Sequence, residues 1–159
     1  MKHPEISVVT EIDFDEFFGL IEELADFENL ERPDSEAKKR LFVDVCGPKN
    51  RIQAFLIRDD GNAVGYAIIF FSYSSFLAKP TLYLEDIYIQ PAMRGKGIGS
   101  FTMKFLARKA VDAGCGRMEW VVLDWNTNAQ EFYDALGAQH MKEWFPYRIT
   151  GEALQALAQ

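Results

Sequence analysis

The stretch Leu82–Ser100 places the tightest limits on how this chain can fold. Its first part, as far as Ile89, is rich in β-branched and aromatic residues and is typical of a strand. The Gln-Pro pair after Ile89 predicts the end of this strand, because proline has no N–H to donate to a sheet ladder. A basic, glycine-rich turn comes next, Arg94–Gly99, and the pattern predicts that a helix begins at Ser100.

A strand, a glycine turn and a helix start together can bind an anion. Glycine lets the backbone approach a ligand closely, and the first N–H groups of a helix have no intrahelical partners. A helix start attracts anions, phosphates above all. Arg94 and Lys96 add positive charge at the same place. The stretch therefore predicts phosphate binding, and the alternative is a tight connection that uses glycine only for its backbone freedom.

This turn matches neither of two common nucleotide-binding motifs. The Walker pattern G-x-x-x-x-G-K-[ST] is absent from the sequence. A dinucleotide-binding turn has G-x-G-x-x-G almost directly after its strand, whereas Gly95, Gly97 and Gly99 alternate and lie further along. Neither a nucleoside triphosphate nor a dinucleotide is therefore the expected ligand.

The turn does match Arg-x-x-Gly-x-Gly, with Arg94, Gly97 and Gly99 in place. This resembles the pyrophosphate-binding turn of the GNAT superfamily of N-acetyltransferases, whose acetyl donor is acetyl-CoA. The Leu-Glu-Asp strand, the turn and a later Trp125-Asn126 pair carry a narrower likeness to the spermidine/spermine and thialysine N-acetyltransferases. The resemblance implies that acetyl-CoA is bound at these positions: Ile87, Tyr88, Ile89, Arg94, Gly95, Lys96, Gly97, Ile98, Gly99, Ser100, Asn126 and Ala129.

Length and composition limit the class of protein and its partners. We expect one domain, residues 1–159, with 48% hydrophobic residues and a formal net charge of −7. That charge favours cationic partners and disfavours nucleic acid and anionic membranes. The N-terminus lacks an apolar signal segment and no apolar run approaches membrane-spanning length, so a cytoplasmic protein is expected. Cys46 and Cys115 are expected to be reduced and buried, no metal site is predicted, and His3 and His140 are too isolated to support a role.

Periodicity predicts an α/β protein. The alternation of strands and helices in the second half predicts parallel strands, and the early hairpin predicts a mixed sheet flanked by helices. The resemblance implies the same mixed sheet, partly splayed between two parallel strands. We expect strands over 6–10, 51–58, 64–73, 82–89, 118–123 and 147–150, and helices over 13–27, from 33 to the stop at 47, 100–113, 126–136 and 152–157.

Two adjacent carboxylates on the central strand are the first catalytic candidates. Neighbours on a strand point to opposite faces, so at most one of Glu85 and Asp86 is expected to face the acetyl group. The resemblance implies that Glu85 is the general base, acting through water, and that Asp86 contacts the substrate. It also implies that main-chain groups of Ile87 and Ile89 are available, with the Ile87 N–H polarising the thioester carbonyl. A salt bridge or an exposed face for the carboxylates, and a fully paired strand, are the alternatives.

A second motif lies on the helix that Asn126 is expected to cap. Spacings of three and four place Ala129, Phe132, Tyr133 and Leu136 on one face. A neutral phenol can donate a proton to a departing thiolate, because their ordinary pKa values differ by only about 1.5. In the matching family motif this tyrosine is the general acid. Tyr133 is otherwise interpreted as a core tyrosine.

Acidic residues cluster where the first helix ends, at Asp26, Glu28, Glu31, Asp34 and Glu36. They are interpreted either as a solvated helix end or as a wall for a cationic substrate. The resemblance places such carboxylates beside the substrate amine, with Glu28 the best match. With the strand pair included, the expected substrate-binding residues are Phe27, Glu28, Glu31, Glu85, Asp86 and Trp125.

These features predict an acetyl-CoA-dependent N-acetyltransferase for a primary amine of a small polycationic substrate: a polyamine, a diamine or a lysine-like amine. Direct attack is expected, because no cysteine or serine lies in a recognisable nucleophile setting. An acetyltransferase for amino-acid amines or protein N-termini, and a non-catalytic acyl-CoA-binding regulator, remain as alternatives. A homodimer is expected from the resemblance alone.

Overall fold

A computed structural model describes residues 4–159 of the chain. His3 lies outside the described residues, as does the start of the N-terminal segment on which the expectation of no signal sequence rests. The chain divides into two compact units, Met1–Val121 and Val122–Gln159, which are described separately. Between residues 4 and 159, no helix combines the length and the apolar character needed to cross a bilayer.

The first unit is built on one five-stranded sheet, with the strands in the order β1-β2-β3-β4-β5. The first four strands pair antiparallel, and β5 pairs parallel with β4. The mixed sheet expected from the sequence is therefore confirmed. The strands are β1 Glu5–Val8, β2 Gln53–Asp59, β3 Asn62–Ser74, β4 Lys79–Ile89 and β5 Arg117–Glu119.

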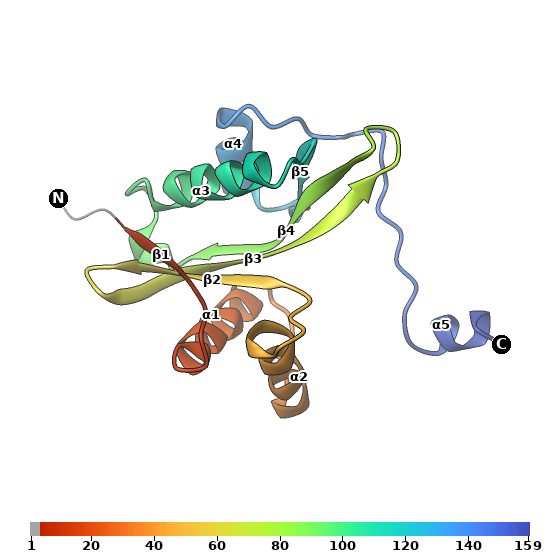
Figure 1. The fold of residues 1–159 in the computed structure, drawn as a ribbon, viewed down its shortest axis with the longest axis horizontal. Coiled ribbons are helices and arrows are strands. Elements are labelled where there is room, and N and C mark those ends of the chain that lie inside the picture. The colour runs from red at the N-terminus through yellow and green to blue at the C-terminus, as the bar shows by residue number, and fades with distance from the viewer. Residues whose placement is uncertain (1–3) are drawn as a thin grey trace. The chain divides into compact units, whose positions relative to one another are not determined.

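Three α-helices of the first unit cover the two faces of this sheet. Helices α1 and α2 lie on one face and α3 lies on the other, as Figure 1 shows. The glycine turn connects β4 to α3 by way of a short 3-10 helix. The helices are α1 Phe14–Phe27, α2 Ser35–Cys46, η1 Pro91–Met93 and α3 Ile98–Asp112; the second unit contains α4 Thr127–Ala135 and α5 Gly151–Leu157.

Aromatic side chains form the core between α1 and the sheet. Phe17 of α1 is fully buried and meets the ring of Tyr66 edge-on, with the ring centroids 5.3 Å apart. Phe14 and Phe18 are also buried at the start of the same helix, and Leu56 of β2 closes the layer beneath them. Full burial of one such side chain stabilises the fold by roughly 1.5–3 kcal/mol. These contacts fix α1 against strands β2 and β3.

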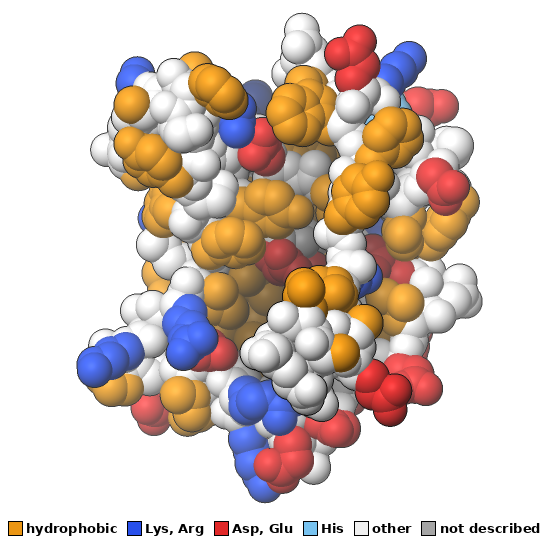
Figure 2. Space-filling model, turned by 90° about the vertical axis from the view of Figure 1, so that its right-hand side faces the viewer, with side chains coloured by type: hydrophobic (Ala, Val, Ile, Leu, Met, Phe, Trp, Pro, Cys, Tyr) orange, Lys and Arg blue, Asp and Glu red, His pale blue; other side chains and the backbone are white. Residues whose placement is uncertain are grey.

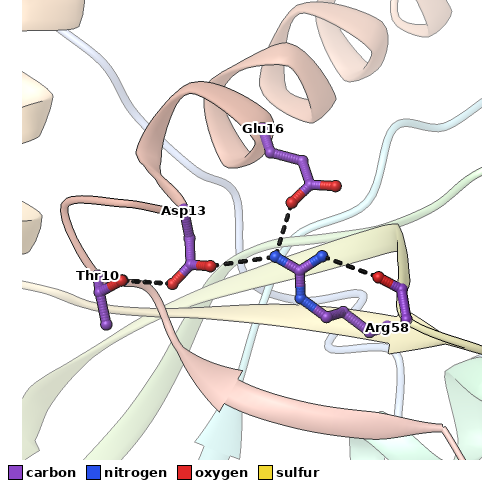
Figure 3. A network of polar contacts seen from close by, with 5 residues as sticks. Thr10, Asp13, Glu16 and Arg58 are labelled. Atoms are coloured by element: carbon purple, nitrogen blue, oxygen red, sulfur yellow. Dashed lines mark hydrogen bonds and ion pairs between the residues drawn. The ribbon is translucent and has the colours of Figure 1, made fainter.

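A polar network fixes the first turn of α1 to the end of β2 (Figure 3). The Arg58 guanidinium donates to Glu16 Oε2 at 2.6 Å and to Asp13 Oδ1 at 3.1 Å. Asp13, the first residue of the helix predicted over 13–27, occupies the N-cap position, but its carboxylate accepts hydrogen bonds from the N–H and hydroxyl of Thr10 instead of capping the helix. The Thr10 hydroxyl, with help from Arg58, lowers the pKa of Asp13.

Several boundaries differ from the sequence predictions. The central strand begins at Lys79 instead of Leu82, because Pro80 pairs with Tyr73 and extends the β3–β4 hairpin. Pro80 is tolerated within the strand, and its carbonyl accepts the Gly116 N–H at 2.9 Å. Helix α3 begins two residues before Ser100. The predicted helices at 13–27 and 126–136 are confirmed to within a residue or two.

Two predicted strands were wrong in part or in full. The strand expected over 118–123 is reduced to β5, and Val121 beyond it is 70% exposed. The segment 147–150 is not a strand, and Tyr147 is 96% exposed. A strand requires a hydrogen-bonded neighbour, and among the described residues neither 120–123 nor 147–150 has one. Cys46 and Cys115 are free thiols as expected, but both are only half-buried.

Candidate active site

The central strand contains a β-bulge at its two carboxylates. Leu84 pairs with Ile69 of the neighbouring strand, and the next register position pairs Ile68 with Asp86. Glu85 is therefore the extra residue, which resets the alternation of side chains along β4. As a result Glu85 and Asp86 line the same cavity. The prediction that these two carboxylates point to opposite faces was wrong.

This cavity has a volume of about 460 Å³ and lies between α1, α2 and the sheet. Such a volume is within the roughly 300–1,000 Å³ that small-molecule sites occupy. Figure 2 shows a face of the molecule on which hydrophobic side chains lie beside acidic ones. Apart from the carboxylate pair, the lining is apolar: Phe18, Ile21, Pro33, Ala37, Leu41, Ile52, Ile68 and Phe70.

Asp86 is the most perturbed carboxylate of the site. Burial raises the pKa of Asp86 to about 6, and the nearby charge of Glu85 adds to this effect. The hydroxyl of Tyr66 donates to Asp86 Oδ2 at 3.2 Å and partly offsets the rise. Asp86 is therefore close to half ionised in mildly acidic solution, whereas Glu85 is exposed at the opening of the cavity.

Glu28 is the residue of the acidic cluster whose charge affects the pKa of Asp86. Partial burial raises the pKa of Glu28, and its charge contributes to the raised pKa of Asp86. Glu31, the other predicted substrate contact of the cluster, is exposed.

The remaining acidic residues of the cluster have local structural partners. Asp26 accepts from the Arg32 Nε at 2.9 Å, and Asp34 caps α2 by accepting the Ala37 N–H at 2.7 Å. Glu36 pairs with a lysine one turn further along the helix, at 2.6 Å. The acidic wall predicted from the sequence is thus largely a set of ordinary helix-end contacts, with Glu28 as its functional candidate.

The main-chain groups of Ile87 and Ile89, which are predicted to contact the cofactor, point away from β3. The N–H of Gln90 donates to the carbonyl of Val64 on β3 at 2.9 Å. Because strand amides alternate in direction, the main-chain groups of Ile87 and Ile89 point toward the β5 side. The β4–β5 ladder ends at Tyr83, well before these residues. Beyond Tyr83, β4 is no longer paired with β5, and this unpaired part includes Ile87 and Ile89, where the resemblance implied that two parallel strands splay apart.

The glycine turn leaves a row of N–H groups at the start of α3. Gly97 caps this helix with φ +81°, a left-handed conformation that glycine adopts without strain. The first intrahelical hydrogen bond runs from the Phe101 N–H to the Gly97 carbonyl, at 2.9 Å. The N–H groups of Ile98, Gly99 and Ser100 come before it. The side chain of Ile98 is buried, so only its main chain could contact a ligand.

The two basic side chains of the turn have different surroundings. The Arg94 guanidinium lies over the rings of Phe27 and Tyr88, at 4.7 and 5.8 Å, and donates to the Ile89 carbonyl at 2.9 Å. The Lys96 ammonium donates a weaker hydrogen bond to the sulfur of Met93, at 3.4 Å. Phe27, predicted as a substrate contact, thus packs against a residue of the cofactor turn.

Sequence reasoning missed two polar residues beside these groups. Tyr66 binds Asp86, and Glu23 accepts hydrogen bonds from the hydroxyl of Tyr88 and the amide of Gln90, at 3.1–3.2 Å. A tyrosine within an apolar strand needs a partner for its hydroxyl, and this need was a usable signal for Tyr66. The signal for Glu23 was weaker, because it lies on a helix with several other acidic residues.

The second unit carries the other predicted residues on and beside α4. The side-chain oxygen of Asn126 caps this helix by accepting the Ala129 N–H at 3.3 Å, as predicted. Burial raises the pKa of Tyr133 to about 12, so its phenol stays protonated throughout the neutral range. Trp125 is 49% exposed directly before the cap.

A strand with paired carboxylates, followed by a glycine turn and the start of a helix, agrees with the CoA-binding acyltransferase that the sequence resemblance implies. The comparison of sequences agrees. Residues 11–138 match the family described as "Acetyltransferase (GNAT) family". The chain belongs to this family, and it is an acyltransferase.

The named relatives of this chain include several amine acetyltransferases. Thialysine N-epsilon-acetyltransferase from Bos taurus is 39% identical over 150 residues, which cover 87% of this chain and 88% of that protein. L-ornithine N5-acetyltransferase from Arabidopsis thaliana is 46% identical over 99 residues, which cover 62% of this chain and 43% of that protein. A spermidine/spermine N(1)-acetyltransferase-like protein from Homo sapiens is 30% identical over 92% of this chain and 22% of its own length. The likeness predicted from the sequence is confirmed.

A solved structure agrees with the fold. The aminoglycoside N-acetyltransferase AAC(6')-Iy in complex with CoA aligns with a TM-score of 0.77 and 23% sequence identity, over 92% of this chain and 95% of that one. The GNAT family uses acetyl-CoA as its acetyl donor, so the expected cofactor is confirmed for the family.

Proposed function

We propose that this protein is an acetyl-CoA-dependent N-acetyltransferase that acts on a primary amine of a small polycationic substrate, such as a polyamine, a diamine or a lysine-like amine. One observation carries the proposal: the bulge in β4 brings Glu85 and Asp86 together at the wall of a cavity, on the strand that leads into the glycine turn. Two carboxylates beside an apolar cavity suit a cation with a hydrocarbon portion. The names of the thialysine and spermidine/spermine relatives support the same class of substrate.

The glycine turn is proposed to bind the pyrophosphate of the cofactor. The N–H groups that precede the first hydrogen bond of α3 point outward, and Gly97 leaves open space beside them. The outward-facing groups of β4 are proposed to hold the pantetheine arm, with the Ile87 N–H on the thioester carbonyl oxygen. The proposed cofactor contacts are the twelve residues named from the sequence, from Ile87 to Ala129.

Acetyl-CoA supplies the activated acetyl thioester, and the protein must move two protons. Glu85 is proposed as the general base that takes a proton from the substrate ammonium through water. The neutral amine then forms the new C–N bond as the C–S bond breaks, without a covalent enzyme intermediate, and the second proton that its nitrogen loses passes through water to re-form the Tyr133 phenol. Tyr133 is proposed to give its proton to the departing sulfur, a role that requires the neutral phenol.

Asp86 and Glu28 are proposed to bind the cationic substrate before reaction. Both carboxyls have raised pKa values, so each gains from a nearby positive charge. Phe27, Glu31 and Trp125 complete the proposed substrate contacts. The resemblance further supports a homodimer as the active form.

A panel of amines incubated with the protein and acetyl-CoA tests the proposal, with acetylated products identified by mass spectrometry. We expect diamines, polyamines and lysine-like amines to be acetylated, with one acetyl group added per reacting nitrogen. Acetylation of peptide N-termini alone would assign the protein to the N-terminal acetyltransferases instead. Cofactor binding without any product from the panel would favour a regulatory protein.

A further inference from the structure

The cavity beside Glu85 and Asp86 is polar at one place only. Its remaining lining comes from apolar side chains of both helices and of β3, among them Phe18, Leu41 and Phe70. No other charged side chain contributes to this lining in the described part of the chain. The lining of the cavity therefore consists of a carboxylate pair and an apolar wall, which is formed by the other lining side chains.

Such a wall distinguishes between the candidate amines, because they differ in what lies between their nitrogens. A methylene group gains from leaving water for an apolar surface, whereas a secondary ammonium placed against that surface loses its hydration without gaining a partner. An unbroken hydrocarbon chain fits this wall. A chain interrupted by a charged nitrogen does not.

The wall also ends where a second charge could return to water. Pro33 and Ala37, which line the cavity between α1 and α2, are only half-buried. A substrate with one nitrogen at the carboxylate pair can thus lay its chain along the wall and keep its far nitrogen in solvent.

We propose that the cavity binds the hydrocarbon spacer of the acceptor, so that the preferred substrates are diamines and lysine-like amines with an unbroken methylene chain, and not polyamines with an internal nitrogen. This inference rests on the proposed function and narrows its substrate class. Glu85 and Asp86 face one nitrogen. The apolar side chains of α1, α2 and β3 select the chain attached to that nitrogen.

Spermidine and 1,8-diaminooctane form a matched pair for the test. Both have eight chain atoms between their terminal nitrogens, and a methylene group of the diamine replaces the internal nitrogen of spermidine. We expect kcat/KM to be at least 10-fold higher for 1,8-diaminooctane. Across shorter diamines, kcat/KM should rise by roughly 3- to 4-fold per added methylene group, which corresponds to about 0.8 kcal/mol, until the chain passes the wall.

A variant with a carboxylate in the wall makes the test specific to this cavity. Ala37→Glu should lower kcat/KM for 1,8-diaminooctane and raise it for spermidine, which moves their ratio by about 10-fold or more. Val43→Glu is the matched control, because Val43 lies on the same helix, is 60% exposed and does not line the cavity. Thermal unfolding of both variants confirms that each is folded. Leu41→Gln, which adds a neutral polar group to the wall, should shift the ratio in the same direction by a smaller amount.

The outcomes separate this inference from the proposed function. Equal or better use of spermidine by the wild type overturns the inference and leaves the acetyltransferase assignment in place. The same ratio in the Ala37→Glu and Val43→Glu variants shows that the preference arises elsewhere. Acetylation of neither amine by a protein that binds acetyl-CoA counts against the proposed function itself.

Discussion

The hydroxyl of Tyr66 donates a hydrogen bond of 3.2 Å to Asp86 Oδ2, which joins β3 to β4 at the carboxylate pair. Tyr66 is fully buried, and its ring meets Phe17 of α1 edge-on. The same phenol thus packs the helix against the sheet and donates to the ionised carboxylate. Of the influences on Asp86, this hydrogen bond is the one that lowers its pKa.

Replacement of Tyr66 by phenylalanine should raise the pKa of Asp86 above its value of about 6, because the charged carboxylate loses its donor while burial and the charge of Glu85 remain. Since ionised Asp86 is proposed to bind the substrate ammonium, the acid limb of kcat/KM should move to higher pH. A pH profile of kcat/KM for a diamine measures this shift. Tyr73→Phe, at a 66% exposed position of the same strand, should leave the profile unchanged.

Replacement of Asp86 by asparagine should stabilise the protein at neutral pH and not in acid. The pKa of Asp86 is raised in the folded protein, so folding takes up a proton between about pH 4 and pH 6. The free energy of unfolding therefore falls as the pH rises through about 6, and above that pH the ionised carboxylate is a cost of the order of 3 kcal/mol. An asparagine cannot ionise and avoids this cost.

Urea unfolding at two pH values measures this difference. We expect the stability gained by Asp86→Asn to be larger at pH 7.5 than at pH 4.5, together with a loss of acetyl transfer. Asp112→Asn, on the exposed surface of α3, is the control and should show no such dependence. An equal change in stability at both pH values would mean that burial does not raise the pKa of Asp86.

The sequence predicted the strand, the turn and the two carboxylates, but not their joint position. Alternation along β4 assigns Glu85 and Asp86 to opposite faces, and only the pairing of Ile68 and Ile69 with β4 reveals the bulge. Register between strands depends on residues far apart in the sequence, so a pattern within one strand cannot supply it. The cavity was missed for the same reason, since its wall combines side chains from α1, α2 and β3.

Local signals were sufficient where a feature depends on neighbours in the sequence. The cap at Asn126 was predicted, and the cap at Asp34 carries the same signal, because in both the capping side chain and its N–H partner lie three residues apart. The sequence leaves the acidic cluster open between two interpretations. Asp26 has a local partner in Arg32, but the sequence alone does not distinguish such a paired carboxylate from Glu28.

Substitution of Gly97 by alanine should weaken acetyl-CoA binding by about 10-fold or more, because a side chain would enter the open space beside the helix N–H groups. The left-handed backbone also makes this change costly by roughly 1–2 kcal/mol in stability. Gly61→Ala is the matched control: Gly61 has the same φ of +81° and the same open surroundings, but lies in the β2–β3 hairpin. Titration calorimetry measures binding, and chemical denaturation measures stability. Equal affinities in the two variants would count against the pyrophosphate site.

Replacement of Tyr133 by phenylalanine should lower turnover by roughly 10²-fold with little change in acetyl-CoA affinity, the usual size of a lost general acid. Steady-state kinetics and calorimetry measure the two quantities. Because the pKa of Tyr133 is raised to about 12, the wild type should show no loss of kcat up to about pH 10 that depends on this residue. Near-normal turnover in the variant would leave Tyr133 as a packing residue, with water as the proton donor.

The two basic residues of the turn should differ when each is replaced by alanine. Lys96 contributes charge through a light contact with a methionine, whereas Arg94 also covers the rings of Phe27 and Tyr88 and donates to the Ile89 carbonyl. Loss of either charge should weaken acetyl-CoA binding in a salt-dependent manner. Loss of Arg94 alone should also reduce the free energy of unfolding by about 1–2 kcal/mol, because a hydrogen bond and two cation–π contacts are removed.

Calorimetry at low and high salt, together with urea unfolding, separates the two effects. Lys96→Ala should weaken binding at low salt and leave the unfolding midpoint unchanged. Arg94→Ala should change both, and it should raise KM for the amine as well, since Phe27 belongs to the helix that carries Phe18 and Ile21 of the cavity wall. If Arg94→Ala alters cofactor affinity only, the contact with Phe27 does not couple the turn to α1, and the two substrates of the enzyme bind independently.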